Sequence, residues 1–129
     1  MKVVVNKCYG GFGLSVKACQ RYLELEGVEC HFYDDDYKKI TVNEASSHCH
    51  ISKKDLGQKA NKKELNDNYF SGYNVERNDP NLIKVVEEMG QKASGGYGKL
   101  EIIEIPDGIE YEIDDYDGME TIHEQHRSW

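Results

Sequence analysis

The sequence lacks long apolar runs. No stretch approaches the roughly 18 apolar residues of a membrane-spanning helix, and only 38% of the 129 residues are apolar. No basic segment followed by an apolar stretch opens the chain, so we expect no secretory signal. The thiols are then expected to be reduced, because disulfides persist mainly in oxidising compartments; they belong to Cys8, Cys19, Cys30 and Cys49. These absences predict a cytoplasmic protein that does not bind membranes.

The sequence also has little positive charge. Its 16 Lys and Arg residues stand against 24 Asp and Glu, giving a net charge of −8 at pH 7. This balance disfavours direct binding of nucleic acid, because phosphates attract clustered positive charge. Residues 1–66 contain 11 basic and 9 acidic residues, whereas residues 67–129 contain 5 and 15. Such asymmetry is typical of a solvated surface or of an acidic face that binds a basic partner.

Apolar periodicity predicts a single α+β domain over residues 1–129. We expect strands at 2–6, 28–33, 99–105 and 109–113, a strand or short helix at 119–124, and helices at 15–26 and 80–93. The first strand–helix–strand order predicts a right-handed parallel crossover. The turn Pro106-Asp107-Gly108 predicts that its flanking strands pair antiparallel. Together these features predict one mixed sheet of four to five strands with two helices packed on one face.

Capping residues mark the ends of both helices. Ser15 is the expected N-cap of the first helix, and Gly27 ends it at the C′ position. Asp79 and Pro80 occupy the N-cap and first helical positions of the second. These residues predict the helix boundaries independently of the rest of the fold.

The segment 34–68 differs in composition from the rest of the chain. It is polar and rich in Lys, Asn, Ser and His, with weak signals for a strand at 40–42 and a helix at 53–65. Long connections of this kind are often functional or mobile. We interpret the segment as an excursion from the core that is either mobile or faces a partner.

A glycine-rich turn joins the first strand to the first helix. Its glycines permit sharp turns and positive φ angles; they are Gly10, Gly11 and Gly13. Val16 stands where a G-x-G-x-x-G fingerprint requires its third glycine, and no Gly-Lys-Ser/Thr sequence follows. The pattern therefore fits either a tight structural turn or a looser anion site at a helix N-terminus.

Three stretches of the chain resemble a family of small uncharacterised proteins found mainly in bacteriophages and prophages. They are KCYGGFGLS at residues 7–15, RNDPNLIKVVEEMG at 77–90, and residues 104–129 with IPD, YDG and the terminal HRSW. The resemblance does not include segment 34–68. The family has no assigned chemistry, so it implies only a context: a phage accessory protein in the cytoplasm of a bacterial host, of a kind that often antagonises host defences.

The glycine turn provides the first functional hypothesis, which is the binding of a small anionic ligand. In the phage context we expect this ligand to be a nucleotide signal of host immunity, which the protein sequesters without a cofactor or metal. Lys7 would add charge, an aromatic side chain would stack on a base, and an arginine would hold a phosphate. The predicted ligand-binding residues are Lys7, Tyr9, Gly10, Gly11, Phe12, Gly13, Ser15, Arg77 and Arg127.

The acidic second half provides an alternative hypothesis. Carboxylates recur between Asp107 and Glu124, and spaced carboxylates on a sheet can imitate DNA phosphates. The protein would then inhibit a host DNA-binding protein. A solvated sheet face is the other interpretation of the same run. Both functional hypotheses leave open a second copy of the chain as a partner.

Two further patterns admit a chemical interpretation. Cys8 lies beside the turn and would be a nucleophile if His31, His123 or His126 served as its base; otherwise it is a small, partly buried apolar side chain. His48 and His50 have the spacing for one face of a strand, where two imidazoles can share a zinc ion with more distant histidines. The usual ligand spacings are absent, so a surface cluster is the competing interpretation.

Overall fold

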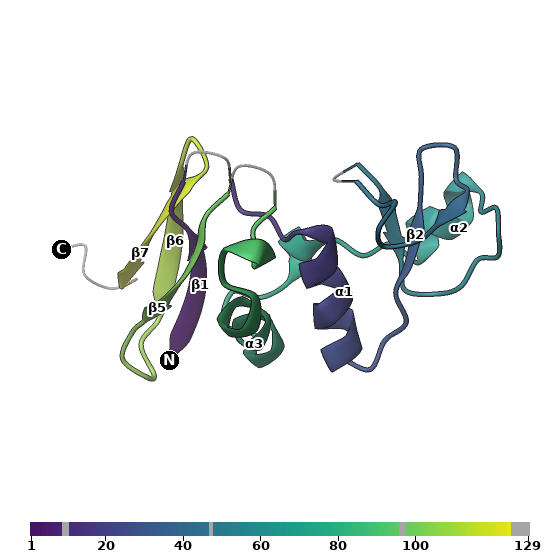
Figure 1. Cartoon of the computed structure of the whole chain (residues 1–129). Coiled ribbons are helices and arrows are strands. Elements are labelled where there is room, and N and C mark those ends of the chain that lie inside the picture. The colour runs from purple at the N-terminus through teal and green to yellow at the C-terminus, as the bar shows by residue number, and fades with distance from the viewer. Residues whose placement is uncertain (9–10, 47, 96–97, 125–129) are drawn as a thin grey trace.

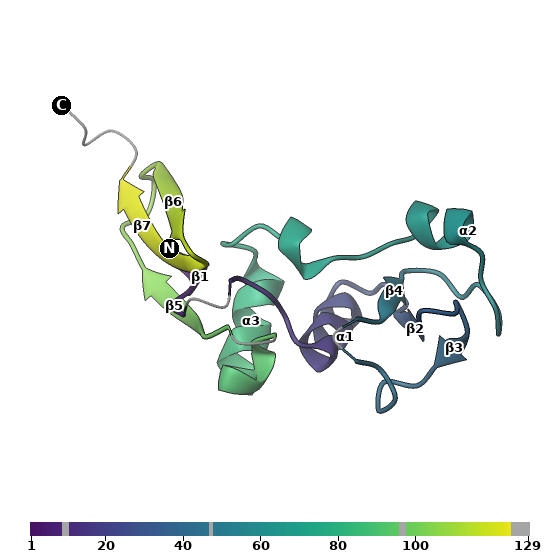
Figure 2. The same ribbon diagram turned by 90° about the horizontal axis from the view of Figure 1, so that it is seen from above.

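The structure, a computed structural model, describes residues 1–8, 11–46, 48–95 and 98–124. Its helices and antiparallel strands confirm the predicted α+β class. The described strands do not form the predicted single mixed sheet, because they are distributed over three separate antiparallel sheets. The elements follow one another along an elongated molecule, with a hairpin at one end and the segment around residues 31–67 at the other (Figures 1 and 2).

The N-terminal strand β1 (Lys2–Asn6) pairs antiparallel with β5 (Leu100–Glu104). The register places Lys2 opposite Glu104 and Asn6 opposite Leu100. The three valines of β1 are fully buried, as their β-branched side chains favour. Both strands were predicted, but their pairing joins residues about a hundred positions apart and could not be inferred from local pattern.

The first helix, α1 (Val16–Leu25), is one residue shorter at each end than the predicted 15–26, and Ser15 is its N-cap as predicted. The Ser15 side chain accepts a hydrogen bond from the N–H of Ala18. Gly27 adopts a φ of +72°, its N–H donates to the carbonyl of Glu24, and the next N–H donates to the carbonyl of Leu23. This is a Schellman ending, which requires a left-handed residue and explains the glycine.

The third helix, α3 (Pro80–Met89), begins where Asp79 and Pro80 predicted. The Asp79 carboxylate accepts from the N–H groups of Asn81 and Leu82. The α-helix ends earlier than expected, and the chain continues as the 3₁₀ turn η2 (Gly90–Ala93). Gly90 has a φ of +59°, which is incompatible with a continuing α-helix.

The helices are layered rather than placed on one sheet face. α3 packs against β1 and β5, and α1 packs against α3 on the side away from the sheet (Figure 1). The predicted arrangement of both helices on one face is therefore wrong. The main core lies between these layers and includes Leu82 and Val85 of α3 with Ala18 and Leu23 of α1.

The far end of the molecule contains a small sheet in which β2 (His31–Tyr33) lies between β3 (Lys39–Ile40) and β4 (His50–Ser52). The helix α2 (Lys62–Asp67) follows. The predicted parallel crossover from β1 to β2 is wrong, because β2 pairs antiparallel in this separate sheet. The segment 34–68 thus contains regular structure, with a second cluster of Tyr33, Ala60 and Leu65.

The hairpin at the opposite end pairs β6 (Tyr111–Tyr116) with β7 (Met119–Glu124). Asp117 and Gly118 both have positive φ, which a two-residue hairpin turn of type I′ requires. The predicted pairing of 109–113 with 99–105 is wrong, since β5 pairs with β1 and β6 with β7. The packing of Trp129 onto the body, which we expect because an exposed indole is costly in water, lies outside the described residues. None of the helices in the described ranges has the length and apolar character needed to cross a membrane.

Candidate functional site

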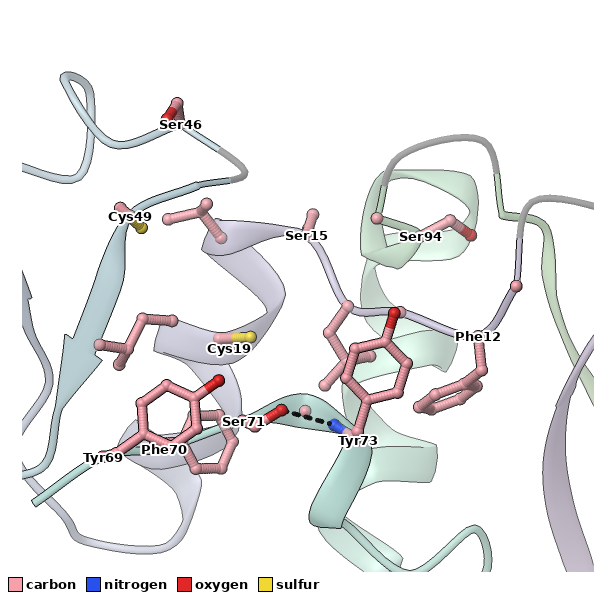
Figure 3. Close-up of a pocket in the computed structure, with 17 residues that line it drawn as sticks. Phe12, Ser15, Cys19, Ser46, Cys49, Tyr69, Phe70, Ser71, Tyr73 and Ser94 are labelled. Atoms are coloured by element: carbon pink, nitrogen blue, oxygen red, sulfur yellow. Dashed lines mark hydrogen bonds between the residues drawn. The ribbon is translucent and has the colours of Figure 1, made fainter. Parts of the chain in front are cut away.

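A pocket of about 500 Å³ opens at the glycine turn before α1 (Figure 3). Two segments form its principal walls, the turn at residues 11–16 and the segment 69–73 on the opposite side. The remaining lining residues are Cys19, Ser46, Cys49, Ile51, Ser94 and Gly95. The volume lies within the range of about 300–1,000 Å³ that is usual for small-molecule sites.

Main-chain bonds hold the turn in place. Gly11 adopts a φ of +83°, and the N–H of Gly95 donates to the carbonyl of Gly13. A Cβ on Gly95 would lie 2.8 Å from the carbonyl oxygen of Leu14, so the two backbones approach as closely as glycine allows. The 93–95 segment therefore supports the turn from behind and fixes this wall of the pocket.

The N-terminus of α1 contributes two main-chain donors to this region. The N–H of Ser15 donates to the carbonyl of Ala93, and the N–H of Ala18 donates to the Ser15 hydroxyl. The same hydroxyl donates to the carbonyl of Lys92 at 2.7 Å. Within the described ranges, no acceptor is found for the N–H groups of Val16 and Lys17. The N–H groups at this helix N-terminus, where an anion site is expected, are thus only partly bound by the protein itself.

Aromatic side chains form the opposite wall. Tyr69 and Tyr73 remain 51% and 70% exposed. The rings of Tyr73 and Phe12 form an edge-to-face pair with centroids 6.3 Å apart, while Phe70 stacks on Tyr22 at 5.8 Å. Each exposed tyrosine is therefore adjacent, in space or in sequence, to a phenylalanine that is anchored in the fold.

Gly72 lets this aromatic segment approach the turn. A Cβ at this position would lie 3.0 Å from the Cγ and Cδ1 atoms of Leu14, closer than nearly all real contacts. The residue begins the 3₁₀ turn η1 (Gly72–Asn74), in which the N–H of Tyr73 donates to the Ser71 hydroxyl. Leu14 is consequently held between Gly72 on one side and Gly95 on the other.

The chemistry of the pocket wall is neutral. Among the described lining residues there is no Lys, Arg, His, Asp or Glu. Hydroxyl groups supply the polar side-chain atoms, and they belong to Ser15, Ser46, Ser71, Ser94, Tyr69 and Tyr73. The wall can therefore offer aromatic surface and neutral hydrogen-bonding groups, and a negative charge would meet main-chain N–H groups only.

The predicted ligand-binding residues are only partly gathered here. Gly11, Phe12, Gly13 and Ser15 line the pocket. Lys7 is not among its lining residues; its N–H donates to the carbonyl of Lys99. The predicted residues Tyr9, Gly10 and Arg127 lie outside the described residues.

Arg77 lies behind the pocket wall rather than in it. Its guanidinium carbon is 3.5 Å from the centroid of the Phe12 ring, a cation–π contact. The two terminal nitrogens of Arg77 bind the two carboxylate oxygens of Glu120 at 2.5 and 2.8 Å. Arg77 therefore contacts Glu120 and Phe12 and is not among the residues that line the pocket, and its role in holding a phosphate stays a prediction.

Sequence reasoning missed the aromatic wall. Tyr69, Phe70 and Tyr73 surround Ser71-Gly72 at the point where order was expected to resume after the polar segment. Three aromatic residues within five positions of a polar stretch were the available signal. Their partner, the glycine turn, lies more than fifty residues earlier in the chain, so only the folded structure brings the two together.

The thiols that line the pocket are protonated, and two histidines contact carboxylates outside it. Burial raises the pKa of the Cys19 thiol to about 12 and also raises the pKa of Cys49, so both lining cysteines are neutral thiols. His31 contacts Glu29 at 3.1 Å and His123 contacts Asp114 at 2.8 Å. No contact between Cys8 and an imidazole is found in the described ranges, and His126 lies outside them. The Cys8 nucleophile remains a prediction without an identified base.

The described residues give no further support to the metal-site hypothesis or to the acidic-face hypothesis. The described residues contain no group of three or more His, Cys, Asp or Glu side chains placed to bind a metal, so His48 and His50 have no third ligand there. On the hairpin, Glu112 and Asp114 are exposed, whereas Glu120 is buried and turned toward β1. The acidic-inhibitor hypothesis stays a prediction.

Comparison of the chain with models of protein families, with curated proteins and with solved structures finds no match in any of the three.

Proposed function

We propose that the protein binds a small organic ligand in the pocket between the glycine turn and the 69–73 segment. The observation that supports this proposal is the pocket itself, with its volume of about 500 Å³ and its two exposed tyrosines. Exposed apolar surface that borders a concavity is typical of a binding site. The described lining residues supply no ionised nucleophile or charged acid–base group, so binding is favoured over catalysis.

The residues that line the pocket offer little to bind the negative charge that we expect of the ligand. Neither Lys7 nor Arg77 lines the pocket, so an anionic group would depend on the N–H group of Val16 and on the helix dipole. In the phage context that the sequence resemblance implies, binding of this kind would remove a small molecule from the host cytoplasm. The proposal predicts sequestration without turnover.

A pair of tyrosine variants tests the proposal. A library of metabolites and nucleotides would be screened by thermal unfolding, because a ligand that binds only the folded state raises the melting temperature. Calorimetry would then compare the wild type with Tyr73→Ala and with Tyr116→Ala, whose side chain is 74% exposed on the distant hairpin. Binding that is lost in Tyr73→Ala and kept in Tyr116→Ala would support the pocket. The proposal would be contradicted if no compound in the library bound, or if both variants bound the ligand equally well.

A further inference from the structure

The exposed rings of Tyr69 and Tyr73 distinguish this pocket from an ordinary surface depression. Figure 3 shows Tyr69 and Phe70 toward one end of the pocket, Tyr73 and Phe12 toward the other, and Ser71 between them. Phe12 is almost fully buried and Phe70 is partly buried, so the bases of both walls are fixed while the tyrosine faces remain open. Open aromatic faces at a concave site favour a flat partner that can stack on them.

The hydrogen-bonding groups of the site are neutral and can act as both donors and acceptors. The residues that line the pocket include four that carry hydroxyl groups, namely Ser46, Ser94, Tyr69 and Tyr73. Ser94 accepts from the N–H of Leu100 at 2.9 Å, which leaves its own proton available. Such groups suit the polar edge of a heterocycle. They do not compensate for several negative charges, whose transfer from water into an unmatched site is costly.

Combining the two observations, we infer that the ligand is an uncharged, planar heteroaromatic compound of the nucleobase or nucleoside class, stacked on Tyr73. This inference rests on the proposed function and specifies the ligand class for the same pocket. It differs from the sequence-based expectation of a nucleotide, since every added phosphate would bring negative charge to a wall whose described residues include no cationic side chain. The net charge of −8 opposes polyanions further.

Calorimetry at fixed ionic strength with matched ligand pairs tests the inference. Adenosine, guanosine, cytidine and uridine would each be compared with the corresponding 5′-triphosphate. At least one nucleoside should bind, and its triphosphate should bind about tenfold more weakly or worse because its charges are unmatched. Tyr73→Ala should weaken nucleoside binding by about tenfold through loss of the stacking surface, whereas Tyr73→Phe, which keeps the ring, should stay within about threefold.

The possible failures are distinguishable. Tighter binding of a triphosphate than of its nucleoside would overturn the inference and leave the proposed function intact. The same conclusion would follow if no nucleoside bound while another class of compound bound in a Tyr73-dependent way. If Tyr73→Phe lost as much affinity as Tyr73→Ala, stacking would be wrong as the mode of recognition. If no ligand of any class depended on Tyr73, both proposals would fall.

Discussion

The guanidinium of Arg77 and the carboxylate of Glu120 form a bidentate ion pair that joins the β6–β7 hairpin to the body of the protein. Glu120 is only 3% exposed, and its Oε1 also accepts from the N–H of Asn6 at 2.8 Å. The carbonyl of Arg77 accepts from the N–H of Val4. One buried pair thereby joins β1, β7 and the loop before α3, and the Arg77 contact with Phe12 extends the connection to the pocket wall.

This pair predicts a large stability difference between buried and exposed carboxylates. Glu120→Gln should lower the free energy of unfolding by about 3 kcal/mol, because it leaves a largely buried guanidinium without its counter-charge. Glu87→Gln is the control, since Glu87 pairs with Lys2 at the surface, and such a pair contributes at most about 1 kcal/mol. Urea unfolding of both variants is the measurement, and equal losses would show that the buried pair has no special role.

The close approach of Gly95 to Leu14 predicts a position-dependent cost of adding a methyl group. Gly95→Ala should destabilise the protein by about 1–3 kcal/mol, because its Cβ would meet a backbone oxygen that cannot rotate away. In Gly13→Ala the nearest atom is the Tyr73 hydroxyl at 3.8 Å, an ordinary contact, and stability should stay within about 0.5 kcal/mol. Thermal unfolding would separate the two; an equally stable Gly95→Ala would contradict the close contact between these two loops.

The buried thiols predict that stability decreases in alkaline solution. Burial raises the pKa of Cys19 to about 12 and that of Cys30 to about 11, whereas the ordinary value is 9.0. At a pH between the ordinary pKa of a thiol and its raised pKa in the folded protein, the unfolded chain has lost its thiol protons and the folded protein has kept them. Rising pH therefore favours unfolding. From about pH 8 to about pH 10, Cys19 alone should account for a loss of about 1 kcal/mol.

A matched variant isolates this contribution. Cys19→Ala will be less stable at every pH because it leaves a small cavity, but its stability should decrease less steeply between the same two pH values. Urea unfolding of wild type and variant at both pH values gives the two slopes. Identical slopes would mean that the Cys19 thiol ionises as readily in the folded protein as in the unfolded chain.

Asp79 caps α3 and also contacts α1, so we expect the stability losses of variants at its two contacts to be non-additive. Its carboxylate accepts from the first-turn N–H groups of α3 and, at 2.9 Å, from the Tyr22 hydroxyl of α1. Asp79→Ala should cost about 2 kcal/mol through loss of the cap, and Tyr22→Phe about 1 kcal/mol. The double variant should lose less than the sum, because the two single changes remove the same bond. Strict additivity in urea unfolding would exclude that coupling.

The local elements of this protein follow from its residue types. Valine-rich β1, the Ser15 and Gly27 ends of α1, and the Asp79-Pro80 start of α3 depend on contacts within one or two turns of the chain, so their residue types predict them. Four predicted site residues that line the pocket belong to this local information, because glycine turns and helix caps are short-range features.

How these elements combine depends on contacts that form only in the folded protein. Strand pairing depends on which edges remain available, and here β5 pairs with β1 while β6 turns back onto β7. The Arg77–Glu120 pair and the meeting of the glycine turn with Tyr69 and Tyr73 join segments more than forty positions apart. Such long-range contacts leave no periodic trace in the sequence, because their energy depends on burial and geometry that exist only after folding.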